Sequence, residues 1–357
     1  MNILHLSPCQ GAFGGIEAFI LAVSDELHTA GASVRVLFKQ VRGFQLRDSL
    51  EQEVHDRPYT IRFVDRGDLK TIAREVQWAN IVHGHNPLLE AVSLSKWFNK
   101  PCVLTVYNWC RRNWHPRPLL WRLANRMVDH RWYISDFVWD SWEPRGRLGS
   151  SGKLPIVSSL PTETVDYGQR RGFVFASRWI PNKGIRVLLE AYARADIDRD
   201  IWPLTLMGDG PLKKEVMTLI QNKNLLQVEI TGFISNQERN DRISSAKWMV
   251  TPPQTNEDLG LTVIESRNVK VPCIITRDGG LPEAAGKLAL ACDPGDAGGL
   301  KNLLEQAARM PESEYRQLAE QSHQELQRYL KPLSLYSRAY RKTIRSHKLS
   351  HTGLNCT

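Results

Sequence analysis

The stretch NILHLSPCQGAFGGIEAFILAVSDELHTAGASVRVLF, residues 2–38, decides the fold class. Residues 3–6 form a short apolar run that predicts a strand, and a loop with three glycines follows. From about residue 17 to residue 30 apolar side chains recur on one helical face, and Gly31 is a typical helix stop. Residues 34–38 predict a second strand. Strand, glycine loop, helix and strand in this order are typical of a βαβ unit in a parallel sheet.

The same alternation continues through the first half of the chain, breaks near residues 158–162 and starts again at Phe173. We therefore expect an α/β protein with two Rossmann-like, doubly wound parallel-sheet domains that face a cleft, followed by a helical tail. The expected domains are 1–160, 161–330, and a C-terminal segment, 331–357, whose helix packs back on the first domain. Further strands are predicted at 81–83, 103–106, 132–134, 173–176, 204–207, 228–230, 248–250 and 273–275, and helices at 88–98, 119–128 and 185–195.

The composition narrows the class of protein. With 357 residues, of which 42% are hydrophobic and 24% charged, the chain is long enough for two ordinary globular domains. Its N-terminus lacks the pattern of a secretory signal, and no apolar run approaches the roughly 18 residues that span a bilayer. The six cysteines are scattered without metal-ligand spacing. We expect a protein of the reducing cytoplasm.

The net charge of +9 favours anionic partners, such as phosphates, anionic membrane or nucleic acid. Nucleic acid is not expected, because the basic residues lack a helix-turn-helix or finger context. Residues 96–153 are rich in basic side chains and tryptophan. Two interpretations stay open. The basic stretch 111–115 and the arginines of the helix 119–128 contact anionic lipid headgroups at the inner face of the membrane. Alternatively, the arginines of the helix lie in solvent above an inward-facing row of Leu119, Leu120, Leu123 and Met127.

The segment EDLGLTVIE, residues 257–265, places two carboxylates eight positions apart. Glu257 lies in the loop after the predicted strand 248–250, and Glu265 lies one turn into a helix that starts near Gly260. The free N–H groups at a helix N-terminus attract anions. A carboxylate in the position of Glu265 can accept two vicinal hydroxyls, such as those of a ribose, while Glu257 is placed to meet a sugar. The alternative is a pair of solvent-facing glutamates.

The segment SRWIPNKG, residues 177–184, follows the first predicted strand of the second domain. Its two cations, Arg178 and Lys183, suit a diphosphate. Fixed cations stabilise the charge of a departing diphosphate without a metal, although a solvated basic turn is the simpler alternative. Gly14 and Gly15 offer a third loop, which lacks a complete dinucleotide or Walker pattern.

Together these motifs resemble the retaining glycosyltransferases of family 4, in glycosyltransferase group 1, which have a GT-B-type fold. The resemblance assigns a catalytic role to two residues, Glu257 and His85. In that family a strand ends in a His-x-His pair, here residues 83–85, and the second histidine reaches the donor sugar. It assigns ribose binding to Glu265 and the donor-sugar loop to Leu259. It assigns the donor diphosphate to Arg178, Lys183, Gly15, Gly260 and Leu261.

The resemblance also implies partners. A retaining, metal-independent hexosyltransferase would move sugar from a UDP- or GDP-sugar, which is a substrate and not a cofactor, to a glycan or lipid-linked acceptor in surface polysaccharide, lipopolysaccharide or glycolipid synthesis. The acceptor would then belong to residues 1–160 and the nucleotide sugar to residues 161–330. Tyr107 and Asn108 replace a common histidine of the family, which leaves the acceptor open. Two alternatives are a sugar-nucleotide epimerase of similar fold and a non-catalytic protein that binds a sugar nucleotide.

Overall fold

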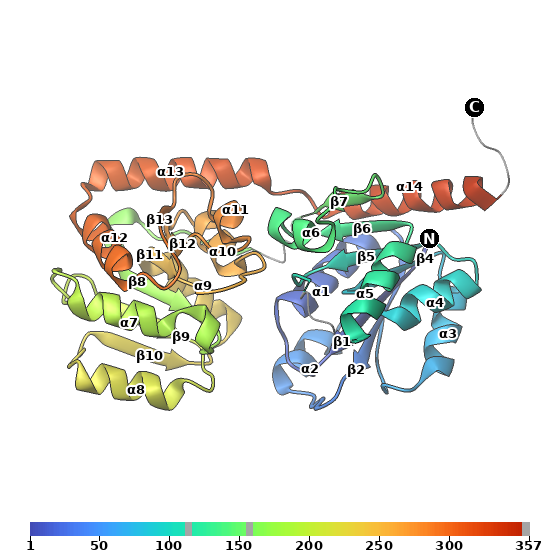
Figure 1. Cartoon of the computed structure of the whole chain (residues 1–357), viewed down its shortest axis with the longest axis horizontal. Coiled ribbons are helices and arrows are strands. Elements are labelled where there is room, and N and C mark those ends of the chain that lie inside the picture. The colour runs from blue at the N-terminus through green and yellow to red at the C-terminus, as the bar shows by residue number, and fades with distance from the viewer. Residues whose placement is uncertain (111–115, 155–159, 352–357) are drawn as a thin grey trace. The chain divides into compact units, whose positions relative to one another are not determined.

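A computed structural model describes residues 1–110, 116–154 and 160–351, and it divides into two compact units (Figure 1). Unit 1 comprises Met1–Ser159 together with Lys331–Thr357, and unit 2 comprises Leu160–Leu330. Each unit is built around one sheet in which all paired strands are parallel. The expected α/β class with two parallel-sheet domains is confirmed.

The sheet of unit 1 has the order β3-β2-β1-β4-β5-β6-β7. The order reverses direction between β1 and β4, so the loops that leave these two strands diverge at their carboxyl ends, where ligands of open α/β sheets bind. The seven strands are β1 (Asn2–Cys9), β2 (Ser33–Gln40), β3 (Thr60–Val64), β4 (Ile81–His85), β5 (Cys102–Val106), β6 (His130–Tyr133) and β7 (Ser151–Lys153).

Two helices of unit 1, α3 and α6, begin at a side chain that caps them. Asp68 accepts a hydrogen bond from the backbone of Thr71 at the start of α3, and Ser135 does the same for α6. The helices are α1 (Gly15–Thr29), α2 (Asp48–His55), α3 (Leu69–Trp78), α4 (Leu89–Trp97), α5 (Pro116–Met127), α6 (Asp136–Trp142) and α14 (Ser334–His351). None of the helices in the described ranges combines the length and apolar character that crossing a bilayer requires.

The last helix, α14, packs against α1 although the whole of unit 2 separates them in sequence (Figure 1). Its inner stripe consists of four buried side chains at helical spacing, Tyr336, Tyr340, Thr343 and His347. The C-terminal segment is therefore part of the core of unit 1.

The sheet of unit 2 has the order β10-β9-β8-β11-β12-β13, and its reversal point lies between β8 and β11. Its core is filled by large aromatic side chains that include the fully buried Trp179 and Trp248. The strands are β8 (Arg171–Ala176), β9 (Leu204–Met207), β10 (Val228–Gly232), β11 (Ala246–Thr251), β12 (Cys273–Thr276) and β13 (Leu290–Cys292).

The helices of unit 2 follow the strands in regular alternation. Ser235 caps α9 through the backbone of Glu238, as its sequence pattern predicts. The elements are the short 3-10 turns η1 (Tyr167–Gln169) and η2 (Pro181–Lys183), and the helices α7 (Ile185–Arg194), α8 (Lys213–Asn222), α9 (Asn236–Ser245), α10 (Leu261–Asn268), α11 (Leu281–Ala285), α12 (Ala297–Arg309) and α13 (Glu312–Tyr329).

The orientation of α5 corrects one of the two readings of the basic, tryptophan-rich stretch. The side chains of Leu119, Leu120 and Leu123 are 69%, 43% and 51% exposed, while Ala124 and Asn125 are buried. An inward-facing leucine row is therefore wrong. The residues that face the sheet are the small and polar ones, and the leucines form an exposed apolar face.

Candidate functional site

The loop after β11, which carries Glu257, is held in shape by Asp278 at the end of the neighbouring strand β12. One carboxylate oxygen of Asp278 accepts from the backbone N–H of Asn256 at 3.0 Å, and the other accepts from that of Glu257 at 2.7 Å. The N–H of Gly280 donates to the Glu257 carbonyl at 2.8 Å. Gly279 has φ +56°, and a Cβ there would lie 2.1 Å from the same carbonyl oxygen. Glu257 is thus fixed at the carboxyl edge of the sheet.

The loop after β8 carries Arg178 and Lys183 and closes against the end of β11. Gly184, which precedes α7, has φ +75°, and a Cβ there would lie 1.7 Å from the carbonyl oxygen of Pro252. The two loops also share a backbone hydrogen bond, from Gln254 to the Asn182 carbonyl, of 2.8 Å. Only glycine permits this approach, so the sequence N-K-G brings the β8 loop against the β11 loop.

This contact joins a cation and a carboxylate. The Nζ atom of Lys183 lies 2.6 Å from Oε2 of Glu257, and both side chains are mostly buried. Arg178 is exposed, and within the described ranges no carboxylate pairs with it. The structure therefore brings Lys183 and Glu257 into direct contact and leaves the Arg178 guanidinium available at the same strand end.

The N-terminus of α10 lies in the next turn of the chain. Gly260 has φ +94°, and a Cβ there would lie 2.3 Å from the Leu281 side chain, so the chain enters the helix in a form that only glycine accommodates well. No side chain caps this helix. Leu259 is buried and Leu261 is partly buried. Their apolar side chains cannot bind an anion, so only their backbone N–H groups could do so.

Glu265 lies one turn further along α10 and is 6% exposed. Its Oε1 accepts from Nη2 of Arg239, in α9, at 3.1 Å. Its Oε2 is buried and has no hydrogen-bond partner in the described part of the chain. Burial raises the pKa of the Glu265 carboxyl, and the charge of Arg239 opposes that rise. A buried acceptor that lacks a donor is costly, and a ligand hydroxyl would satisfy it.

Two residues of this site are missing from the sequence-based prediction. Arg239 is one, because nothing in the sequence links a helical arginine to a glutamate 26 positions away. Asp278 is the other. Its position directly after a buried strand and before two glycines is the signal that could have marked it.

His85 lies at the end of β4 in unit 1, and its side chain is fully buried. Its Nε2 is 2.9 Å from Nδ1 of His5, and its Nδ1 is 2.7 Å from the Tyr107 hydroxyl. Burial lowers the pKa of the His85 imidazole well below its usual value, and the nearby His83 and His5 lower it further. His85 is therefore a neutral member of a hydrogen-bonded cluster, and Tyr107, a departure from the family pattern, is one of its partners.

The cluster contains three histidines, His5, His83 and His85, whose ligand atoms lie within 4.8 Å of one another. His83 hydrogen-bonds through Nδ1 to the hydroxyl of Tyr340 at 2.6 Å and through Nε2 to that of Thr105 at 2.8 Å. Only Nε2 of His5 lacks a partner in the described residues of the cluster. The hydrogen bonds account for the remaining nitrogens, which favours a structural network over a metal site.

Gly15 begins α1 directly after the loop that leaves β1, and Gly14 precedes it with extended backbone. Both glycines are exposed. No residue at the N-cap position caps the helix through its side chain. Burial raises the pKa of the Glu17 carboxyl at this helix start, and backbone hydrogen bonds from Glu17 and Gly14 oppose that rise.

A family model described as "Glycosyl transferases group 1" matches residues 161–325. This segment belongs to glycosyl transferases group 1. Among relatives, the 2-deoxystreptamine N-acetyl-D-glucosaminyltransferase of Niallia circulans is 26% identical over 247 residues, which cover 60% of this chain and 62% of that protein. In the first relatives that it matches, the chain spans between 30% and 62% of the relative's own length.

Solved structures resemble the group 1 segment and the rest of the chain alike. The HepE protein of Anabaena, solved with UDP and glucose, has a TM-score of 0.74 at 15% identity and covers 97% of this chain and 100% of its own. A glycosyltransferase from Rickettsia africae has a TM-score of 0.79 at 16% identity and covers 96% and 98%. At this identity the likeness confirms the GT-B-type fold and nothing finer.

Proposed function

We propose that the protein is a retaining glycosyltransferase of family 4 that uses a nucleotide-diphosphate sugar as donor. The observation that carries the proposal is Glu265, whose buried Oε2 lacks a donor one turn inside a helix whose N-terminus is uncapped. The vicinal hydroxyls of a ribose supply the missing donors. The UDP in the HepE structure and the activity named for the Niallia relative support the same reading.

The roles of the other residues follow from their positions. Arg178 and Lys183 lie at the end of β8 and neutralise the diphosphate, together with the backbone of Gly260 and Leu261. Glu257, which contacts Lys183, orients the transferred sugar. Because fixed cations and a helix N-terminus balance the charge of the departing diphosphate, the proposed reaction needs no metal.

Retention is proposed to proceed by attack of the acceptor on the face from which the diphosphate leaves. The acceptor oxygen forms a bond to the anomeric carbon as the bond to the phosphate oxygen breaks, and the departing phosphate takes the acceptor proton. His85 remains a proposed donor-sugar contact. Its imidazole is neutral and both ring nitrogens have partners, so a sugar hydroxyl would have to replace His5 or Tyr107 as the hydrogen-bond partner.

The proposed acceptor is a glycan or a lipid-linked acceptor at an anionic membrane. The exposed face of α5, which contains Leu119, Leu120, Trp121 and Leu123, supports membrane contact because apolar and basic residues together favour the interface of an anionic bilayer. The exposed Trp97 of α4 adds a further aromatic group. The basic stretch 111–115 lies outside the described residues.

A donor screen tests the proposal. UDP-, GDP- and ADP-sugars are added to the protein, and thermal stabilisation, donor hydrolysis and donor isomerisation are measured. We expect one nucleotide to stabilise the wild type, and Glu265→Gln to lose that stabilisation while Glu238→Gln, an exposed glutamate of the same unit, keeps it. Isomerised donor without hydrolysis or transfer would favour the epimerase, and stabilisation by none of the nucleotides would contradict the proposal.

A further inference from the structure

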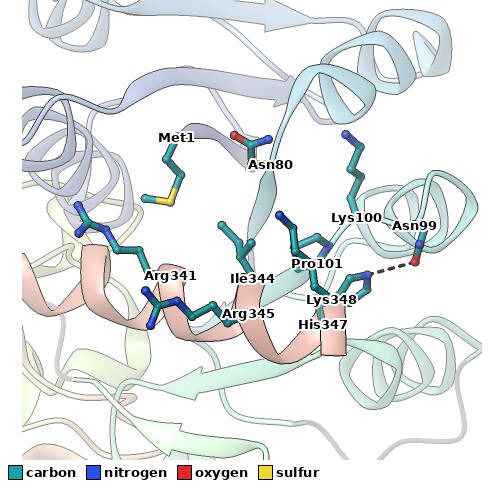
Figure 2. Close-up of a pocket in the computed structure, with 10 residues that line it drawn as sticks. All are labelled: Met1, Asn80, Asn99, Lys100, Pro101, Arg341, Ile344, Arg345, His347 and Lys348. Carbon is teal, nitrogen blue, oxygen red and sulfur yellow. Dashed lines mark hydrogen bonds between the residues drawn. The ribbon is translucent and has the colours of Figure 1, made fainter. Parts of the chain in front are cut away.

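The basic helix α14 has a hollow along one flank whose volume is about 700 Å³. Its other wall consists of residues that directly precede strands of unit 1, namely Met1 before β1, Asn80 before β4 and Pro101 before β5. The hollow therefore lies at the amino ends of these strands, at the opposite edge of the sheet from Gly15 and His85. It is therefore separate from the site of the proposed transfer. Figure 2 shows the residues that line the hollow.

The charged side chains that line this hollow carry basic groups. Arg341, Arg345 and Lys348 of α14 and Lys100 of the opposite wall line it, and within the described residues no Asp or Glu does (Figure 2). Lys100 donates to the carbonyl of Ala79 at 2.8 Å, which fixes its ammonium at the rim.

The two arginines carry the inference. Arg341 and Arg345 are one helical turn apart and exposed, and no carboxylate of the described residues pairs with either. Like charges at this spacing destabilise a helix. Residues 334–351 contain five Lys and Arg and no Asp or Glu, so α14 itself offers no compensation. A second hollow, of about 520 Å³, lies on the other flank and is lined by the same two arginines.

The hollow has a rigid base. His347 is buried beneath it and is held by Asp129 at 2.8 Å and by Asn99 at 3.1 Å, and Tyr340 anchors the preceding turn to His83. The cations therefore project from a helix that is fixed to the core, and a ligand does not have to order them first.

We propose that this hollow binds an oxyanion of the phosphate type that carries more than one negative charge. Arginine forks match phosphate oxygens in pairs, and two neighbouring arginines that no carboxylate of the described residues pairs with favour a polyvalent anion over a monovalent one. The phosphate belongs either to a free anion or to a lipid headgroup, and the two sources share this chemistry.

Inorganic pyrophosphate and vesicles that contain phosphatidic acid, whose phosphomonoester carries up to two negative charges, are the probes. We expect Arg341→Gln/Arg345→Gln to weaken binding of at least one probe five-fold or more in calorimetry or flotation, and Arg341→Lys/Arg345→Lys to restore part of it. Arg42→Gln/Arg66→Gln removes the same charge from exposed positions of unit 1 and should leave binding unchanged. Pyrophosphate also fits the proposed donor site, so Arg178→Gln/Lys183→Gln removes that contribution. The pyrophosphate binding that remains in this variant should still depend on Arg341 and Arg345.

Pyrophosphate binding that is lost when Arg341→Gln/Arg345→Gln is combined with Arg178→Gln/Lys183→Gln would identify a free anion. Vesicle binding that Arg341→Gln/Arg345→Gln weakens, without such an effect on pyrophosphate, would identify a headgroup. The proposal is overturned if the wild type binds neither probe. It is also overturned if Arg341→Gln/Arg345→Gln behaves like the Arg42→Gln/Arg66→Gln control.

Discussion

The amine of Lys183 lies 2.6 Å from a carboxylate oxygen of Glu257, 74 residues further along the chain. The pair joins the two strand ends on either side of the reversal point of the sheet of unit 2. A lysine that binds a diphosphate must divide its charge between the ligand and this glutamate. Glu257 and the diphosphate therefore compete for the positive charge of Lys183.

Glu257→Gln removes the competitor and keeps the shape of the side chain. We expect UDP or GDP to bind two- to five-fold more tightly to this variant, while turnover falls at least about 100-fold because the sugar loses an orienting group. Lys183→Gln should weaken nucleotide binding instead. Calorimetry and a transfer assay measure the two effects, and weaker nucleotide binding by Glu257→Gln would contradict the competition.

Arg239→Leu tests whether the hydrogen bond from Arg239 holds Glu265 in position to bind a ribose. Hydrogen bonds to charged groups contribute about 1.5–3 kcal/mol, so we expect roughly ten-fold weaker nucleotide binding. Without Arg239 the pKa of the Glu265 carboxyl rises further, because burial raises it and the opposing charge of Arg239 is gone. The deficit should therefore be largest at low pH and shrink as the pH rises and the carboxylate ionises.

The matched control for this experiment is Arg242→Gln. Arg242 lies on the same helix but pairs with the exposed Glu229 at 2.5 Å. Equal binding by Arg239→Leu and Arg242→Gln at every pH between 6 and 9 would show that Arg239 does not support the ribose site.

Gly279→Ala tests whether the β12 loop must approach Glu257 closely. The new Cβ would meet the backbone of Glu257 at 2.1 Å. We expect the variant to lose about 1–3 kcal/mol of stability and to bind nucleotide less well. Gly295→Ala is the control, because Gly295 also has a positive φ, of +79°, but open space around it. Chemical denaturation compares the two, and an equal loss would mean that backbone conformation alone matters.

The histidine cluster predicts how the stability of unit 1 depends on pH. Burial lowers the pKa of His5 from 6.5 to about 3 and lowers those of His83 and His85 as well. Below about pH 6.5 the unfolded chain therefore binds protons that the folded unit does not. The stabilising contribution is complete above that pH and is lost as the pH falls toward 3.

Hydrogen exchange of β1 and β4 between pH 7 and pH 5 measures this loss for unit 1 alone. We expect His5→Gln to reduce the pH dependence by about one proton, and His55→Gln, which changes an exposed histidine, to leave it unaltered. A pH dependence of His5→Gln identical to that of the wild type would refute the assignment.

Membrane contact through α5 predicts that Leu119→Gln/Leu123→Gln floats with anionic vesicles roughly ten-fold less than the wild type, since burying a leucine contributes about 1.5–3 kcal/mol. The control is Ile201→Gln/Leu226→Gln, which changes two apolar residues of unit 2 that are 59% and 79% exposed. Equal flotation of the two double variants would show that α5 does not contact the membrane.

The sequence predicted the alternation of strands and helices because buried parallel strands are continuous apolar runs and helices repeat every 3.6 residues. It also predicted where Glu257, Glu265, Arg178 and Lys183 lie along those elements, since strand ends and helix starts have local signals. It did not predict the short edge strands β3 and β7 or the short helices α2 and α6. Their apolar patterns are too brief to stand out.

The remaining differences depend on contacts between distant residues. The outward orientation of Leu119 follows from which face of α5 meets the sheet, and the amphipathic pattern alone suggested the opposite. The pairing of Arg239 with Glu265 requires α9 to pack against α10. The enclosure of His85 by His5 and Tyr107 requires three strands in register.

The hydrogen bond between His83 and Tyr340 spans 257 positions of the chain. During synthesis the N-terminal residues leave the ribosome first, yet the core of unit 1 lacks α14 until residues 334–351 have emerged. Unit 2, whose residues run continuously from 160 to 330, has its full sequence earlier. The second unit of the sequence can therefore finish folding before the first, and a chain released a few dozen residues early would carry a complete unit 2 beside an open unit 1.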